Sequence, residues 1–247
     1  MSNARNIASG AKFVETAGDT MTGDLAITKS DASITPDADA DDFVIEGNQA
    51  IGMTIGSSAS SVGSIRFADS GSPRAGMLYY SHITNEMRLY TNATQHLTVN
   101  SSGHVTTPSQ PAFGIKMNAV SGINATSSTI VIAGSAYFNS SSLQQTGGSN
   151  FAVGTGRFTA PVSGFYQFNV SIRFDGHSGN YIYITLVDNG AAISRNLTSL
   201  GFTYMTLSMS KAHYLHANDY VEIHINCSAD TSVVLDGDSY FSGYLIG

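Results

Sequence analysis

The sequence has little charge, one cysteine and no long apolar run. Only 12% of its 247 residues are charged, about half the usual share of roughly 25%, which argues against a helical bundle or coiled coil. The single Cys227 excludes a disulfide scaffold. No apolar run approaches the roughly 20 residues of a membrane span, and residues 1–10 lack the apolar core of a secretory signal. We therefore expect no membrane insertion. Aromatic and β-branched residues run through most of the chain, which argues against disorder.

The net charge of −7 is concentrated near the N-terminus. Residues 1–50 hold nine acidic and three basic side chains, a balance of −6, which leaves nine acids and eight bases in residues 51–247. Nucleic-acid phosphates are bound by clustered Lys and Arg, which this sequence does not have. We expect no nucleic-acid partner.

Turn-forming segments divide the chain into three parts. Residues 28–42 are polar and rich in Asp, and residues 106–111 hold two prolines. We predict an N-terminal attachment segment and acidic linker over 1–42, a β-rich shaft domain over 43–107 and a head domain over 108–247.

The predicted shaft domain has the pattern of an antiparallel meander. Short apolar segments alternate with turn residues at a spacing of about 8–13 positions. The expected strands are Phe43–Ile45, Ile51–Ile55, Ser64–Phe67, Met77–Tyr80, Met87–Tyr90 and His96–Val99. This segment is too small for a generous core of its own, so we expect it to obtain burial from neighbouring copies of the chain.

The predicted head domain has the pattern of an all-β sandwich. Apolar and polar residues alternate over Gly164–Phe174, which is the period of a half-buried strand. The same period recurs around Ile182–Leu186, before a tight hairpin turn at Asn189-Gly190, and again over Val221–Cys227. A last strand is expected over Tyr240–Ile246, and no segment of this half supports an amphipathic helix.

This half has a series of aromatic landmarks: Pro111–Phe113, Tyr137–Asn139, Phe151, the run GRFTAPVSGFYQF at Gly156–Phe168, and Tyr240–Leu245. They resemble those of the globular head of the complement and tumour necrosis factor superfamily. Val170 and Thr146 depart from the family pattern, which has an aromatic residue and Asn or Asp there. The resemblance covers roughly residues 110 to 247. It implies a ten-stranded jelly roll that assembles as a homotrimer.

The N-terminal half resembles parts of bacteriophage tail fibres. Ala17–Leu25 (AGDTMTGDL) is similar to a motif that recurs in these fibres, and Gly63–Phe67, Met77–Tyr80 and Leu97–Val105 are similar to their β-rich shaft repeats. The resemblance implies a trimeric receptor-binding protein of the virion, with an intertwined shaft and an N-terminal segment bound to a tail or baseplate protein.

Strand parity indicates where such a head would bind a bacterial surface polysaccharide or outer-membrane protein. If both chain ends of the head lie at its base, counting strands backwards puts the loops at 175–180, 197–203 and 228–239 at the far tip. The candidate receptor-binding residues are Asp175, His177, Asn180, Tyr204, Asp230 and Asp238. The alternative is a structural virion spike or decoration protein whose head is a trimerisation and folding cap. A secreted signalling ligand would need a signal peptide or membrane anchor, which we do not find.

We expect no enzyme activity, metal or cofactor. The Asp-rich run Asp37–Asp42 fits a solvated linker better than a calcium loop, because it lacks the required Gly. Calcium at the head tip would draw on acids such as Asp175, Asp230, Asp236 and Asp238, but turn chemistry explains them better. His213 and His216, three apart on a strand, would face opposite sides. Cys227 falls in an apolar row, and no catalytic motif appears.

Overall fold

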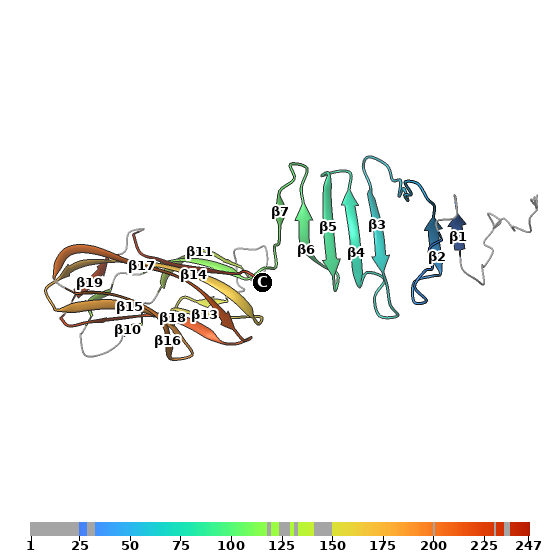
Figure 1. The fold of residues 1–247 in the computed structure, drawn as a ribbon. Helices are drawn as coiled ribbons and strands as arrows, with labels where there is room; N and C mark the ends of the chain where they lie inside the picture. Colours follow the sequence, from blue (N-terminus) through green and yellow to red (C-terminus); the bar gives the residue numbers. More distant parts are fainter. Residues whose placement is uncertain are drawn as a thin grey trace, which may run out of the picture. The chain divides into compact units, whose positions relative to one another are not determined.

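The computed structural model describes residues 25–28, 33–117, 120–123, 129–130, 133–140, 150–199, 201–229, 231–234 and 238–247. Their secondary structure is entirely β, without a helix in these ranges (Figure 1). The strands are β1 Leu25–Thr28, β2 Phe43–Glu46, β3 Val62–Phe67, β4 Gly76–Ser81, β5 Glu86–Thr91, β6 Thr94–Val99, β7 Val105–Thr106, β8 Ala112–Met117, β9 Val120–Ile123, β10 Thr129–Ile130, β11 Ala133–Ser140, β12 Phe151–Ala152, β13 Arg157–Thr159, β14 Gly164–His177, β15 Tyr181–Asp188, β16 Ala191–Ser199, β17 Phe202–Leu215, β18 Tyr220–Cys227, β19 Thr231–Val234 and β20 Tyr240–Leu245.

The chain divides into two compact units, Met1–Ser57 and Ser58–Gly247. In the first unit, β1 and β2 pair in parallel. The expectation that Phe43–Ile45 opens the antiparallel meander is therefore wrong, since this segment pairs with Leu25–Thr28 instead. Ile51–Ile55 forms no strand, although its apolar residues alternate as expected. The predicted domain boundaries at 42 and 107 stay predictions.

The meander itself is confirmed over β3–β7. These five strands form one antiparallel sheet in which each strand is hydrogen-bonded to its neighbour in the sequence. The predicted strands from Ser64 to Val99 all appear, each slightly longer than expected. A register shift between Leu89 and Tyr90 interrupts the pairing of β5 with β6.

The head domain is a sandwich of two antiparallel sheets. The seven-stranded sheet runs β11-β8-β20-β14-β19-β9, with β17 on the other side of β14, and the six-stranded sheet runs β12-β13-β18-β15-β16, with β10 on β18. Sequence-distant strands β8 and β20 lie side by side, because Phe241 pairs with Ile115 and Gly243 with Phe113. The all-β jelly-roll expectation is confirmed.

Five of the aromatic residues that carried the resemblance form the core between the sheets. Phe113 stacks on Phe158, with 4.7 Å between ring centroids, and meets Phe241 edge to face at 4.8 Å. Phe151 and Phe168 complete the cluster, and all five side chains are fully buried. Packed aromatic pairs of this kind add stability beyond the area they bury.

The longest strand follows its predicted alternation and continues beyond it. In β14 the even-numbered residues from Gly164 to Phe174 are buried, and the strand extends to His177. The turn after β15 also has the predicted geometry, because Asn189 and Gly190 have φ values of 46° and 86°. Positive φ at both central residues is what a type I′ hairpin requires.

The two ends of β14 define the two ends of the head. Beside its first residues, the amide of Phe165 donates to the carbonyl of Gly247 at 3.0 Å, and the amide of Leu245 donates to that of Pro111 at 2.9 Å. The proximal end therefore holds both the start of the head, after β7, and its last strand. The other end of β14, at His177, lies at the distal end.

Candidate functional site

Three loops meet at the distal end of the head. They follow β14, precede β17 and follow β18. The amide of Tyr181 donates to the Ser228 hydroxyl at 2.9 Å, and the amide of Ser228 donates to the Tyr181 carbonyl at 2.9 Å. A Cβ on Gly179 would lie 2.7 Å from His177 Cε1, and one on Gly201 would lie 2.7 Å from the His177 carbonyl oxygen. The loops pack so closely that glycine is required at both positions.

A polar cluster around Arg173 brings three of the candidate residues together on the outer face of the seven-stranded sheet. Arg173 Nε lies 3.3 Å from Asp175 Oδ1, and its Nη1 forms an ion pair with Asp238. The guanidinium also lies over the ring of Tyr204, 5.4 Å from the ring centroid. β14 and β17 position these groups, since Asp175 is directly opposite Tyr204 in the sheet.

The charged groups of this cluster are suited to hydrogen bonding. The ion pair with Asp238, more than the one with Asp175, raises the pKa of Arg173 above its ordinary value. The guanidinium therefore stays charged, and two carboxylates leave an excess of one negative charge beside it. Tyr204 presents an aromatic face to solvent, with 65% of its surface exposed. Carboxylate acceptors beside an exposed ring suit a polyhydroxylated ligand or a polar protein epitope.

His177 has a different place from the one its candidate role assumed. Its side chain is 4% exposed and lies against Phe202, with 5.4 Å between the ring centroids. The sequence-based expectation that it would be offered on the tip surface is therefore wrong in this structure. Strict alternation would place His177 on the outer face with Arg173 and Asp175, but Gly176, with a φ of 70°, interrupts the alternation and His177 is buried.

The remaining candidates are not part of the Arg173 cluster. Asn180 is exposed in the loop before β15, on the same distal end. Asp230 and Asp236 lie outside the described residues. Receptor binding by the six candidate residues stays a prediction.

The described distal acids do not fit a calcium ion. Asp175 and Asp238 are held by the same guanidinium, which occupies the position that a cation would take between them. Within the described ranges no group of three or more His, Cys, Asp or Glu side chains is arranged to hold a metal ion.

The two histidines near the end of β17 have different partners. His213 Nε2 lies 3.0 Å from Asp188 Oδ2, whereas the ring of the exposed His216 meets that of Tyr214 edge to face. His216 follows the end of β17, so the strand geometry assumed for the two histidines does not extend to it.

A second polar cluster lies on the outer face of the six-stranded sheet. Glu222 Oε2 accepts from Arg157 Nε at 2.6 Å, and its Oε1 lies 2.8 Å from His224 Nε2. The Arg157 guanidinium stacks on Tyr220, 4.1 Å from the ring centroid. Burial raises the pKa of Glu222, but the bonds from Arg157 and His224 outweigh it and bring the pKa below 4.5. This cluster ties β13 to β18.

Sequence reasoning missed Arg173 and the Glu222 cluster, yet part of the signal was present. Arg173 and Asp175 are two apart on a strand, as are Glu222 and His224, and such pairs share one face. Their partners Asp238 and Arg157 are 65 residues away in the chain. The strand register brings Arg157 to Glu222, and the path of the chain before β20 brings Asp238 to Arg173.

Comparisons with known proteins concern the head. The model of the C1q domain family matches residues 120–246. Among solved structures, the globular domain of zebrafish complement 1qA protein is similar at 18% identity and a TM-score of 0.42, covering 56% of this chain and 98% of that one. Murine APRIL is similar at 12% identity and a TM-score of 0.43, and the match covers 56% of this chain and 99% of that one. Eiger TNF from S. frugiperda is similar at 14% identity and a TM-score of 0.44, and the match covers 57% of this chain and 94% of that one. No curated protein matches the sequence. In the part of the chain that the structure describes, no helix is long and apolar enough to span a membrane.

Proposed function

Because the chain belongs to the C1q domain family, we propose that it is a homotrimeric receptor-binding protein of a bacteriophage tail fibre. The head adheres to a polysaccharide or outer-membrane protein of the bacterial surface, without catalysis, through its distal end. Residues 1–42 attach the fibre to a tail or baseplate protein, and the protein resides on the virion. The observation that carries the proposal is the convergence of three loops at the end of the head farthest from its connection to the preceding sheet.

Trimeric assembly is supported by the family and by the surface of the head. C1q-like and tumour necrosis factor-like domains generally form homotrimers. The outer face of the seven-stranded sheet exposes Phe165 and Tyr214, which are in edge-to-face contact, and Tyr240 and Tyr244 of the adjoining β20. Exposed aromatic residues gathered on one face are typical of protein interfaces. We assign the part of this face that holds these four aromatic residues to contacts between copies of the chain, and leave its distal part, around Arg173 and Tyr204, outside these contacts.

Recognition at the tip follows from the chemistry of the Arg173 cluster. Tyr204 offers a ring face for the C–H side of a sugar or for an apolar side chain. Asp238 and Asn180 offer acceptors and donors around it. Three such sites in one trimer bind a repetitive surface with an avidity that exceeds the affinity of a single site.

The test is adhesion of the full-length protein to whole cells. Fluorescently labelled protein is incubated with a panel of bacterial strains, and strains that bind it are then tested with the tip variants Tyr204→Ala and Asp238→Asn. The matched control is His216→Ala, which changes an exposed residue at the proximal end. Tip variants that lose most cell binding while the control retains it support the proposal. Tip variants that bind as well as the unaltered trimer contradict the assignment of the tip.

The second candidate is a structural spike whose head serves as a trimerisation and folding cap. It is favoured by the way Arg173 is neutralised and His177 is buried, which leaves the tip without a strongly charged or open site. A protein that is trimeric but binds no strain, no polysaccharide and no envelope preparation in such a panel supports this alternative.

A further inference from the structure

The β3–β7 sheet has one face made of apolar residues in register across its strands. Direct cross-strand partners lie on the same side of a sheet. Two rows therefore cross this face, one formed by Ile65, Leu78, Leu89 and Leu97, and the other by Tyr80, Met87, Val99 and Val105. Phe67 extends the face at the end of β3. None of these side chains is ionisable near neutral pH.

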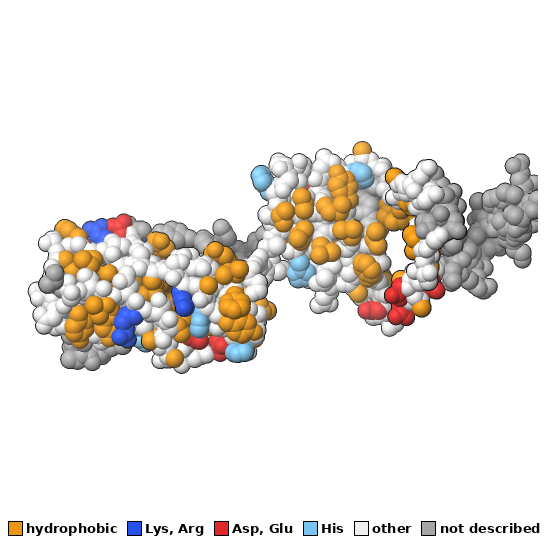
Figure 2. All heavy atoms as spheres, in the orientation of Figure 1, with side chains coloured by type: hydrophobic (Ala, Val, Ile, Leu, Met, Phe, Trp, Pro, Cys, Tyr) orange, Lys and Arg blue, Asp and Glu red, His pale blue; other side chains and the backbone are white. Residues whose placement is uncertain are grey.

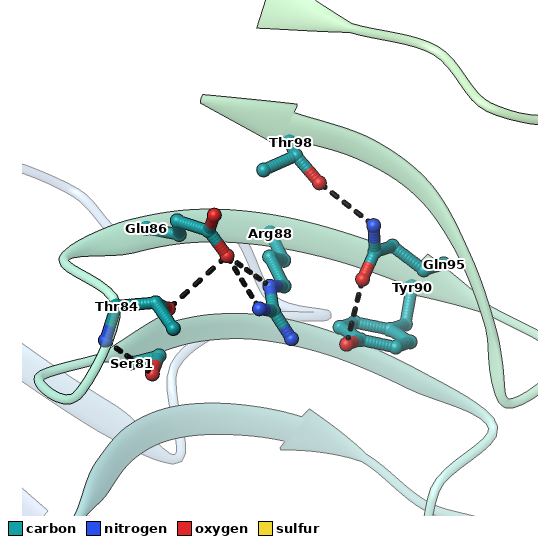
Figure 3. A network of polar contacts seen from close by, with 7 residues as sticks. All are labelled: Ser81, Thr84, Glu86, Arg88, Tyr90, Gln95 and Thr98. Atoms are coloured by element: carbon teal, nitrogen blue, oxygen red, sulfur yellow. Dashed lines mark hydrogen bonds and ion pairs between the residues drawn. The ribbon is translucent and has the colours of Figure 1, made fainter. Parts of the chain in front are cut away.

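The opposite face of the same sheet carries charged and polar side chains that bond to one another, beside Met77, Tyr79 and Tyr90. Glu86 accepts from Thr84 at 3.1 Å and from Arg88 Nε at 3.0 Å, while Tyr90 donates to Gln95 at 3.1 Å (Figure 3). Gln95 in turn donates to Thr98 at 2.7 Å (Figure 3). This face needs no partner to satisfy its hydrogen-bonding groups.

Burial in the single chain is the reverse of what these two faces require. Along β5, Glu86, Arg88 and Tyr90 are partly buried, whereas Met87 and Leu89 are exposed, Leu89 at 43%. Phe67 is 64% exposed, and Figure 2 shows hydrophobic side chains gathered over β3–β6. Sheets of globular proteins bury their apolar face against a second layer. The second layer for this sheet is absent from the single described chain.

The size of the face indicates an interface. β3–β6 are four strands of six residues each, and with a spacing of about 4.8 Å and a rise of about 3.4 Å per residue they cover roughly 20 Å by 20 Å, or about 400 Å². An exposed apolar patch of roughly this size is as large as the largest patch of a typical monomer, and such patches are often functional.

The connection to the head identifies the occupant. β7 ends at Thr106 and β8 begins at Ala112, so the connecting segment spans roughly 20 Å at most. Three joined heads would therefore hold three copies of this sheet within that distance of the head, at high effective concentration. Uncharged faces of identical composition can meet one another without burying a charge.

We propose that the apolar face of β3–β7 packs against the same face of the two other copies in the trimer, making residues 62–106 a second trimerisation interface. The inference rests on the proposed homotrimer and deepens it, because it assigns a dry shaft interior to these residues. The polar network of Glu86 and Arg88 then faces solvent along the outside of the fibre.

Thiol protection in the full-length protein tests the proposal. Leu89→Cys places a thiol at the centre of the apolar face, and Arg66→Cys places one on the opposite face of β3, where Arg66 is exposed. The natural Cys227 is fully buried and gives little background. In the native protein we expect Leu89→Cys to react with a maleimide at least about tenfold more slowly than Arg66→Cys, as for groups reached only through local opening. In denaturant both should react alike.

The oligomeric mass of each variant separates the possible failures. A trimeric Leu89→Cys protein whose thiol reacts as fast as that of Arg66→Cys overturns this inference and leaves the proposed function standing. A monomeric unaltered protein contradicts the homotrimer itself. A monomeric protein with a protected thiol shows that another part of the same chain covers the face, which also overturns the inference. If Leu89→Cys does not fold, Leu78→Cys, its direct partner in the same row, gives the same comparison.

Discussion

At the scale of single residues, Glu222 is a charged side chain buried in the head. Its side chain is only 3% exposed, so its charge depends on Arg157 and His224 for compensation. A buried carboxylate that loses its partners costs several kcal/mol, and one that is neutralised loses its charge-assisted bonds.

We predict that Glu222→Gln destabilises the protein by about 1.5–3 kcal/mol, the range for hydrogen bonds to charged groups. The isosteric amide keeps the volume but weakens the bond from Arg157, which is itself partly exposed. The measurement is urea denaturation followed by circular dichroism, with Glu86→Gln as the control. Glu86 is also paired with an arginine, but its side chain is 24% exposed. Glu86→Gln should therefore lower the free energy of unfolding by clearly less than Glu222→Gln. If the two substitutions lowered the free energy of unfolding equally, the burial of Glu222 would not strengthen its ion pair.

The same carboxylate predicts a pH dependence. Its folded pKa lies below its ordinary value of 4.5 despite the opposing effect of burial, because of Arg157 and His224. A depressed folded pKa stabilises the protein above the unfolded pKa, and this contribution is lost as the pH falls through the folded pKa. The stability difference between the unaltered protein and Glu222→Gln should therefore be constant from pH 7 down to about 5 and shrink below about 4.5. A difference that grows on acidification would contradict the assigned sign.

The candidate site also shows what single residues reveal in a sequence. Asp175, Tyr204 and Asp238 were identified individually, and the structure brings them together. Arg173, which joins them, was overlooked because it was read only as the polar half of an alternating strand. Its partner Asp238 depends on how the segment after β19 lies against β14, which no local pattern encodes.

At the scale of elements, the alternation of apolar and polar residues predicted those strands whose two faces differ most in burial. β14, β15 and β18 follow it because one face of each lies in an aromatic and aliphatic core. Ile51–Ile55 has the same period but forms no strand, because period alone does not supply a hydrogen-bonding neighbour. Phe43–Ile45 pairs in parallel with Leu25–Thr28. A parallel pair is not joined by a tight hairpin turn, so the sequence contains no turn signal for it.

The hairpin between β15 and β16 gives a prediction at this scale. Gly190 has a φ of 86°, and a Cβ there would meet no atom within 4 Å. Gly190→Ala should therefore destabilise the protein through backbone strain alone, by about 1–2 kcal/mol. Thermal denaturation compares it with Gly154→Ala, where the space is also open and φ is not positive. An Ala at 190 that is no worse than one at 154 would contradict the type I′ turn.

At the scale of the whole molecule, the sparse charge of the sequence acquires a structural reason. The chain carries two uncharged surfaces that a soluble monomer rarely exposes: the aromatic patch of Phe165, Tyr214, Tyr240 and Tyr244 on the seven-stranded sheet, and the apolar face of β3–β7. Sequence analysis anticipated burial against neighbouring copies for the shaft, from the shortness of its strands. It did not anticipate that the two faces of that sheet would differ so sharply, because the face on which each residue lies follows from the strand register.

The mass of the full-length protein in solution tests the central claim most directly. Light scattering coupled to size-exclusion chromatography, at micromolar concentration, should give about 78 kDa, three times the 26.0 kDa of one chain. A mass near 26 kDa would leave both uncharged surfaces in water and would contradict the trimer on which the proposed function and the shaft interface depend.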